Sequence, residues 1–358
     1  MEMFECRMVH YTGNNLETEI PLGLQVGAKP VVLIVHDECI FHSNDATKVI
    51  WVEGDKHDLR PKSNGQSQHV SGFCCPCHGF VSDNEMKSYK IISPGSDGTW
   101  TNNHLAEQFE SVIPLFKSAH PDCDLLFLFD NSMNHHAFAP DALIASRLNL
   151  GDGGVSTPKL RDTVWNNAVQ KMQYENGLQK GIKTILEERG CWELGMKLAD
   201  AKKLLSSHTD FAASKEWLQE IAESHEVLVN YFPKFHCELN FIEMVWCFTK
   251  CHLRRECTFS FHDLKVKLPI ALDSIPSPFF KKVYQHCLRR MSCYRIGLIG
   301  SVQDFAVKKF SRHRSITPDD VANVRIEYEV FLEAKEKKYP FKVDHSANVE
   351  ENNSEINE

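Results

Sequence analysis

Long apolar runs are missing from this chain of 358 residues. No stretch of about 18 apolar residues occurs, as a membrane-spanning helix would need. The first residues also lack the charged-then-apolar pattern of an export signal. We therefore expect a protein that is neither secreted nor held in a membrane. Thiols stay reduced in such a setting, so the 13 cysteines predict small buried side chains rather than a disulfide framework.

Several catalytic signatures are also missing. The chain has no Gly-x-Ser-x-Gly elbow and no glycine-rich phosphate loop, so serine-hydrolase and kinase chemistry have no support. It has no internal repeat, which argues against a solenoid. Apolar residues make up 42% and charged residues 25% of the chain, a globular composition that can bury one large core or two modest ones.

Positive charge is in deficit, because the formal net charge is −8. A nucleic-acid binder usually shows a basic patch. Part of the acidity lies in residues 344–358, which lack apolar periodicity and are predicted to form a disordered tail. The segment 234–295 has the opposite bias and contains Lys250, Arg254, Arg255, Lys265, Lys267, Lys281, Lys282, Arg289, Arg290 and Arg295. Charge is thus segregated along the chain, and the total hides a basic region.

Two apolar segments are typical of strands buried on both faces. The run Pro30–Val35 delivers Asp37 at its far end, and the run Cys123–Phe129 delivers Asp130. Alternating or β-branched patterns predict further strands over 48–53, 69–75 and 226–232. Helices are predicted over 105–117, 140–145, 168–224 with polar breaks, 238–254, within 259–309, and over 317–338. This order of strands and helices predicts an α/β fold.

Three acidic residues occupy positions suited to two-metal phosphoryl chemistry. Such chemistry needs carboxylates that converge on a pair of Mg²⁺ ions, because hard cations prefer oxygen ligands. Asp37 and Asp130 follow the two buried strands, and Glu243 lies about one turn into the helix after Pro233. We expect Glu243, at the margin of an apolar helix face, to point toward the sheet. Taken singly, each acid could equally be a cap or a turn former.

Three segments carry a family resemblance. His36-Asp37-Glu38-Cys39-Ile40-Phe41, Phe129-Asp130-Asn131 with His135, and Leu239-Asn240-Phe241-Ile242-Glu243 with Trp246 resemble, in order, the three catalytic blocks of mariner-type DNA transposases. The similarity extends to a branch of DDE superfamily endonucleases common in fungal genomes, in which the segment 233–240 precedes the glutamate. It covers roughly residues 25 to 275.

The resemblance implies a ribonuclease-H-like mixed sheet with flanking helices and a helical insertion before the last catalytic helix. It implies a DDE endonuclease and strand transferase, with Asp37, Asp130 and Glu243 as catalytic and metal-binding residues and two Mg²⁺ or Mn²⁺ ions as cofactors. The implied partner is double-stranded DNA, both transposon ends and target, which predicts residence in the nucleus. A homodimer is compatible with this interpretation.

The chain departs from the family pattern in several places. Phe241 replaces a proline and Cys39 replaces a serine. About 110 residues separate Asp130 from Glu243, against about 35 in compact members, so an insertion with its own structure is expected. An N-terminal helix-turn-helix that reads terminal repeats is also expected in this branch and is missing here, as in a truncated gene product. The expected parts are an extension (1–24), the endonuclease domain (25–258, insertion about 151–225), a basic helical region (259–340) and the acidic tail (341–358).

Residues around the three acids suggest supporting roles. His135 is predicted to orient water or the scissile phosphate, or else to cap its loop. Asn131 either supports the Asp130 loop or forms its turn. His36 should point to the opposite face of its strand from Asp37. Lys250, Arg254 and Arg255 lie two to three turns beyond Glu243 on its helix and are predicted to hold DNA phosphates.

A cysteine motif lies apart from these segments. Cys74-Cys75-Pro76-Cys77-His78 contains a Cys-x-x-Cys, Cys74 and Cys77, with a neighbouring histidine. It could supply half of a tetrahedral zinc site. No second half is evident in the sequence, so we expect metal-free cysteines at a buried strand end.

A rival interpretation comes from a different functional class. A catalytically inactive, transposon-derived DNA-binding or scaffold protein would keep the fold without turnover. The three acids favour the enzyme, because converging carboxylates repel one another without a cation. The missing DNA reader favours the scaffold, and an RNA-cleaving enzyme is a third, more distant alternative.

Overall fold

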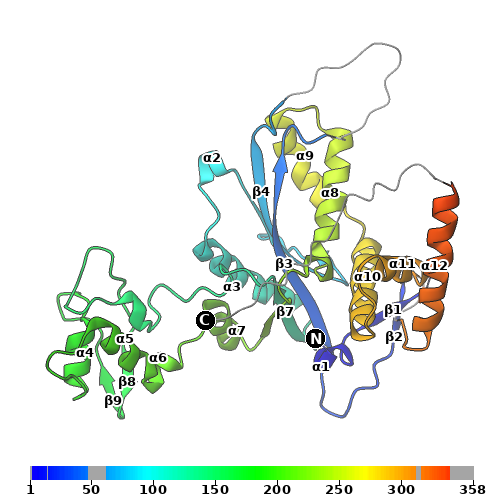
Figure 1. The fold of residues 1–358 in the computed structure, drawn as a ribbon. Coiled ribbons are helices and arrows are strands. Elements are labelled where there is room, and N and C mark those ends of the chain that lie inside the picture. The colour runs from blue at the N-terminus through cyan, green and yellow to red at the C-terminus, as the bar shows by residue number, and fades with distance from the viewer. Residues whose placement is uncertain (1, 14, 47–61, 312–315, 339–358) are drawn as a thin grey trace. The chain divides into compact units, whose positions relative to one another are not determined.

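A computed structural model describes residues 2–13, 15–46, 62–311 and 316–338. Figure 1 shows these residues as a ribbon. The chain divides into two compact units, residues 1–281 and 282–358. The strand predicted over 48–53 and the tail predicted over 341–358 lie outside the described residues. In the part of the chain that is described, no helix has the length and apolar character needed to cross a membrane.

A six-stranded sheet is the centre of the first unit. Its strands are β3 (Val31–His42), β4 (Ser67–Cys75), β5 (Gly79–Phe80), β6 (Tyr89–Ile92), β7 (Asp124–Phe129) and β10 (Leu228–Tyr231). β4 pairs antiparallel with β3, β5 and β6, whereas β7 pairs parallel with β3 and β10 pairs parallel with β7. This order, an antiparallel meander extended by two parallel strands beyond its first strand, is the ribonuclease-H-like arrangement predicted from the sequence.

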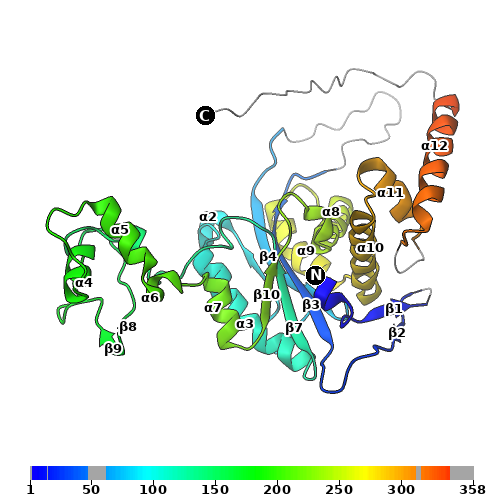
Figure 2. The ribbon, with the colours of Figure 1, turned by 60° about the horizontal axis from the view of Figure 1, so that its bottom comes forward.

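Helices cover both faces of the sheet (Figure 2). On one face, α3 (Asn102–Ala119) and α7 (Trp217–Ser224) share an apolar core with the even-numbered apolar residues of β3 and the odd-numbered ones of β7. On the other, α8 (Ile242–Glu256) contacts β3 and α9 (Phe261–Asp273) contacts β4. The continuous apolar character of β3 and β7 follows from this burial on both faces.

β3 is longer than predicted. The sequence suggested a strand that ends before Asp37, but β3 continues to His42. Its parallel pairing with β7 does stop at Val35, while its antiparallel pairing with β4 continues to the pair His42 and Ser67. Asp37 therefore lies within a strand, at the point where one of its two neighbours ends.

The insertion between β7 and β10 is only partly helical. It contains the hairpin β8 (Thr163–Trp165) and β9 (Ala168–Gln170), then α4 (Ile182–Glu188), α5 (Leu198–Ser207) and α6 (Thr209–Ala212). The prediction of helical structure from 168 onward was wrong at its start. Asn166 and Asn167, both at positive φ (49° and 64°), make the two-residue turn that favours a hairpin. Residues such as Leu160, Met172 and Ile185 form a separate core for this segment.

The helix predicted over 140–145 was also wrong. A turn at 140–141, a bend and two irregular residues occupy 140–144, and a short 3-10 helix, η1 (Ala145–Arg147), begins at the last predicted position. Arg147 donates to the carbonyl oxygens of Ala139 (2.7 Å) and Phe138 (3.3 Å). These side-chain bonds satisfy acceptors that a regular helix would have used, so proline at 140 starts a turn instead.

The remaining elements are short or lie near the chain ends. They are α1 (Glu2–Glu5), the pair β1 (His10–Thr12) and β2 (Thr18–Ile20), α2 (Pro94–Asp97), the 3-10 helix η2 (Cys237–Leu239), α10 (Ser277–Arg295), α11 (Gly300–Lys309) and α12 (Asp320–Lys338). The helices predicted over 105–117, 238–254, within 259–309 and over 317–338 are confirmed by α3, α8, α9 to α11, and α12. The strands predicted over 69–75, 123–129 and 226–232 are confirmed by β4, β7 and β10. α11 and α12 contribute to a small core of the second unit.

Candidate active site

Three carboxylates line one pocket of about 430 Å³. Asp37 comes from β3, Asp130 directly follows β7, and Glu243 is in the first turn of α8. β3 and β7 pair in register up to Val35 and Leu128, so the same register two residues on brings Asp37 opposite Asp130. Neighbouring strands are about 4.8 Å apart. Two of the acids therefore come from adjacent strands and the third from a helix that crosses the sheet.

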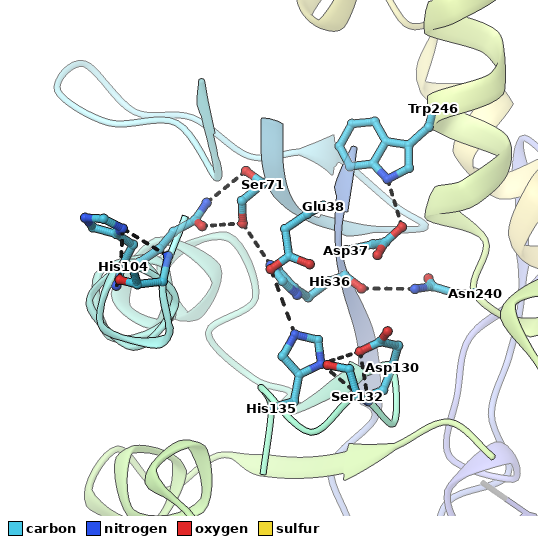
Figure 3. A network of polar contacts seen from close by, with 12 residues as sticks. His36, Asp37, Glu38, Ser71, His104, Asp130, Ser132, His135, Asn240 and Trp246 are labelled. Atoms are coloured by element: carbon cyan, nitrogen blue, oxygen red, sulfur yellow. Dashed lines mark hydrogen bonds and ion pairs between the residues drawn. The ribbon is translucent and has the colours of Figure 1, made fainter. Parts of the chain in front are cut away.

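Asp37 lies on the α8 side of the sheet. The indole Nε1 of Trp246 donates to its Oδ2 at 3.1 Å (Figure 3). Burial, and next the charge of Glu243, raise the pKa of Asp37 to about 8. Burial also raises the pKa of Glu243. Carboxyl groups that resist ionisation beside one another become favourable anions once a cation shares the site. This donor set therefore fits a hard divalent cation.

Asp130 is paired with His135. Nδ1 of His135 forms an ion pair with the Asp130 carboxylate and lies 3.0 Å from the Asp130 carbonyl oxygen. The backbone N–H of Ser132 donates to the same carboxylate at 3.3 Å. Burial opposes ionisation, but these contacts hold the pKa of Asp130 below its ordinary value. Figure 3 shows His135 beside Asp130, where its ring caps the start of the loop after β7.

The three acids are not drawn into one tight cluster. Among the described residues, two groups of at least three potential ligands have their ligand atoms within 4.8 Å of one another, and neither is Asp37, Asp130 and Glu243. Glu243 lines the same pocket, close enough for its charge to raise the pKa of Asp37, although its side chain is also exposed to solvent.

One of the two tight groups is His36, Glu38 and His135. The prediction that His36 points away from Asp37 is confirmed, since it is fully buried on the α3 side. Its Nε2 lies 2.9 Å from Ser71 Oγ, and Ser71 Oγ donates to Gln108 of α3 at 2.6 Å. Burial lowers the pKa of His36 to about 4. Glu38 was not among the residues predicted from the sequence, although strand alternation could have placed it on this side.

Glu38 connects this group to the acid pocket through His135. Nε2 of His135 lies 3.9 Å from Glu38 Oε1. Burial opposes ionisation of both residues. The hydrogen bonds with Asp130 and Glu38 nevertheless raise the pKa of His135 to about 10, while His36 and His135 hold the pKa of Glu38 below its ordinary value. His135 is thus a buried cation between two carboxylates.

Asn131 is bonded to a histidine of the loop that follows β7. It lines the acid pocket, but its Oδ1 lies 2.9 Å from Nε2 of His136, whose Nδ1 is 2.6 Å from Glu216. Tyr231 of β10 also donates to Glu216, at 2.7 Å. Asn131 therefore ties the loop after β7 to the end of the sheet, through His136, Glu216 and Tyr231.

The predicted phosphate-binding cations differ in availability. Arg254 donates to Asp45 at 3.1 Å and forms an ion pair with it at 3.0 Å. Asp45 follows β3 in the chain, so the pattern of residues along α8 could not reveal this ion pair. Lys250 lies over the ring of Phe41, with 5.7 Å between Nζ and the ring centroid, and Arg255 is exposed. Lys250 and Arg255 are the better candidates for contact with a polyanion.

Phe235 is an exposed aromatic residue that no sequence motif singled out. Its side chain is 99% exposed at the wall of the acid pocket. Its φ of 66° is in the left-handed region, which costs free energy for a residue with a Cβ. A large apolar side chain held in solvent by a strained backbone, next to three carboxylates, suits stacking on a ligand ring.

Replacing His135 by Gln should lower stability by about 2 kcal/mol, the size of a hydrogen bond to a charged group. The folded pKa of about 10 lies above the ordinary value of 6.5. The charge therefore contributes fully below pH 6.5, and its contribution declines as the pH rises toward 10. Urea unfolding of wild type and His135→Gln, without added divalent cation, should show a stability difference that shrinks over this range. A constant difference would contradict the buried cation.

Fold and pocket together define a ribonuclease-H-like α/β domain with a carboxylate-lined pocket. No protein-family model matches the chain, and no curated protein matches it in sequence.

Solved structures of Mos1 transposase are similar to it. In a paired-end complex with the left transposon end, the identity is 9%, the TM-score 0.41, and the match covers 78% of this chain and 56% of that chain. For the Mos1 mariner paired-end complex with Mn, the identity is 11% and the TM-score 0.42, and the match covers 74% of this chain and 54% of that chain. For the Mos1 strand transfer complex, the identity is 10% and the TM-score 0.41, and the match covers 78% of this chain and 54% of that chain. The matched region is thus little more than half of those chains.

Proposed function

We propose that this chain is the catalytic part of a DNA transposase of the DDE class, a metal-dependent DNA endonuclease and strand transferase. One observation carries the proposal: Asp37, Asp130 and Glu243, far apart in sequence, line one pocket of a ribonuclease-H-like sheet. The order of the three sequence segments supports it independently. The endonuclease domain would span about residues 25–258, and the working compartment would be the nucleus.

In this proposal each acid has its own part. Asp37 and Asp130, from adjacent strands, would hold a pair of Mg²⁺ or Mn²⁺ ions between them, and Glu243 would complete the second position from the helix. Bound divalent cations supply activation of an attacking oxygen and neutralisation of charge on the leaving oxygen. No covalent bond between protein and DNA is needed.

The neighbouring residues would position these acids. Trp246 holds Asp37 through its indole N–H, and His135 holds Asp130 while it supplies a positive charge. Lys250 and Arg255 would contact phosphates, which orient a duplex but do not identify its sequence. Phe235, exposed at the same pocket, would stack on a base that has left the duplex.

A second function, a DNA-binding or scaffold protein without turnover, has one observation in its favour. The three acids do not converge within the spacing of a tight ligand group, and Asp130 is engaged by His135. If this arrangement persisted on DNA, the protein would bind without cutting. The two functions share a substrate and a possible dimeric assembly, and differ only in turnover.

Nicking of DNA separates them. The purified chain is incubated with supercoiled plasmid and with an end-labelled duplex, with Mg²⁺, with Mn²⁺ and without divalent cation. The transposase proposal expects nicking that depends on the cation. Folded protein that binds the duplex but leaves it intact under all conditions would support the scaffold. Preferential cleavage of an RNA/DNA hybrid would instead assign the pocket to an RNA-cleaving enzyme.

A further inference from the structure

Four side chains from distant segments meet at the edge of the sheet near the end of α3. Cys75 is the last residue of β4, Cys77 and His78 lie in the turn to β5, and His120 caps the C-terminus of α3, 45 residues from Cys75. Each offers one ligand atom, and the four atoms lie within 4.8 Å of one another. His120 supplies the ligand that was missing from the half zinc site of the cysteine motif, and no spacing in the sequence revealed it.

The spacing of the four atoms matches a tetrahedral metal site. The two sulfurs are 3.8 Å apart, and Nδ1 of His78 is 3.3 Å from Nε2 of His120. Sulfur-to-nitrogen distances are 3.6, 3.8 and 3.9 Å. Zinc bound by two thiolates and two imidazoles has tetrahedron edges of about 3.8 Å between sulfurs, about 3.3 Å between nitrogens and about 3.5 Å between the two types. An ion could therefore be accommodated with shifts of a few tenths of an ångström.

The motif differs from the Cys-x-x-Cys expected from the sequence. Cys74 is fully buried in β4 and alternates to the other face of the strand, where the charge of Asp37 acts on it. The spacing used is Cys75-x-Cys77, with His78 next to it. The backbone N–H of His78 donates to Cys75 Sγ at 3.4 Å, a contact that stabilises a thiolate. The Cys74–Cys77 pair of the sequence motif is therefore not the pair that faces the two histidines.

Neither a disulfide nor a reactive cysteine accounts for the cluster as well as a metal site does. A disulfide needs sulfurs about 2.05 Å apart, whereas these are 3.8 Å apart and both cysteines are free. A reactive cysteine would need one histidine partner and an open side for substrate. Here two imidazoles and two sulfurs surround one point. Cys75 and His120 are buried, while His78 is exposed, which leaves a route for an ion to enter.

We infer that Cys75, Cys77, His78 and His120 bind one zinc ion in a closed, four-coordinate structural site. Four protein ligands leave no position for substrate, so the site braces the fold and does not take part in phosphoryl chemistry. Binding releases the two thiol protons to solvent. The ion would tie the β4–β5 turn to the end of α3, the helix that supplies Gln108 to the network around Ser71 and His36. Tetrahedral S₂N₂ ligation favours zinc among the common ions.

Metal content of the full chain tests the inference. Protein purified without chelator should contain about one zinc per chain by mass spectrometry of the metal. Exchange with Co²⁺ should give a sulfur-to-cobalt charge-transfer band and the visible bands of a tetrahedral ion. The three carboxylates of the acid pocket supply oxygen ligands only, so they cannot produce the sulfur band. The result therefore does not depend on whether the chain cuts DNA.

Two variants locate the site. Cys77→Ser and His78→Asn change residues that are not fully buried and should reduce zinc affinity by more than the roughly 10–100-fold that loss of a supporting neighbour causes. His78→Cys should retain zinc and strengthen the sulfur band. Cys251→Ser and His262→Asn, both outside the cluster and at least partly exposed, are matched controls that should keep the ion.

If the variants fail to fold, the metal content and the Co²⁺ spectrum of the wild-type protein are sufficient to test the inference. Folded wild type that contains no zinc, and whose spectrum with Co²⁺ lacks the sulfur band, overturns the inference. Zinc that is retained by both Cys77→Ser and His78→Asn overturns it as well.

Discussion

Asp130→Asn should abolish cation-dependent nicking, with a fall of about a thousandfold or more. Loss of one of three carboxylates removes several kcal/mol of stabilisation from the reacting phosphate, and each step of about 1.36 kcal/mol is a factor of ten in rate. The amide keeps the shape of the side chain and loses only its charge. Asp37→Asn and Glu243→Gln should have effects of the same order, because all three acids line one pocket. Single-turnover nicking of a labelled duplex with Mn²⁺ measures the rate.

Asp37→Asn should increase the stability of the folded protein, although it abolishes nicking. Burial and the charge of Glu243 raise the pKa of Asp37 to about 8. A carboxyl group whose pKa is higher in the folded than in the unfolded chain destabilises the folded state once the pH rises above the pKa of the unfolded chain. The neutral amide avoids this at neutral pH, so Asp37→Asn should melt at a higher temperature than wild type without added divalent cation. A substitution that gains stability and loses activity is typical of an active site.

Controls for these variants are carboxylates outside the pocket. Asp122→Asn and Glu193→Gln change exposed residues and should leave nicking within about twofold of wild type, as surface substitutions usually do. If Asp130→Asn and Glu243→Gln both fold and nick like these controls, the proposed triad is wrong. The nuclease would then have to use other residues.

Arg189→Leu should destabilise the insertion by about 3–5 kcal/mol, the cost of leaving a buried charge without its partner. The side chain of Arg189 is fully buried, and Asp210 is almost so. The guanidinium donates to both oxygens of Asp210, at 3.0 and 2.6 Å, and to Gln170 at 2.8 Å. Its central carbon also lies 4.3 Å from the ring centroid of Trp165. One side chain thus joins the β8–β9 hairpin to α6.

Limited proteolysis followed by mass spectrometry measures this effect locally. Cleavage in Arg189→Leu should begin within residues 151–212, because these residues have a core of their own. The double variant Arg189→Leu/Asp210→Leu should recover much of the lost stability, since replacing both members of a buried pair by apolar residues is often neutral. Equal protease resistance of wild type and Arg189→Leu would mean that the ion pair contributes little.

Much of the fold could be predicted from local patterns. The apolar runs 30–35 and 123–129 are strands because a segment buried on both faces must be apolar throughout. The helix after Pro233 begins close to Glu243, and Phe241 takes a φ of −67°, the value that a proline at this position would impose. These features depend on residues near one another in the chain, so composition and periodicity reveal them.

Tertiary pairing decided the rest. β3 extends past Asp37 because β4 supplies hydrogen bonds to His42, and Arg254 is engaged by Asp45, 209 residues away in the chain. The four-residue cluster needs His120, which no motif connects to Cys75.

The sequence by itself therefore determined the α/β class and the identity of the three acids as candidates. Only the tertiary structure decided which side chains share a pocket, which cations are already paired, and which cysteines face a histidine. Periodicity reports the environment of each residue, whereas a site depends on distances between segments that sequence spacing does not contain.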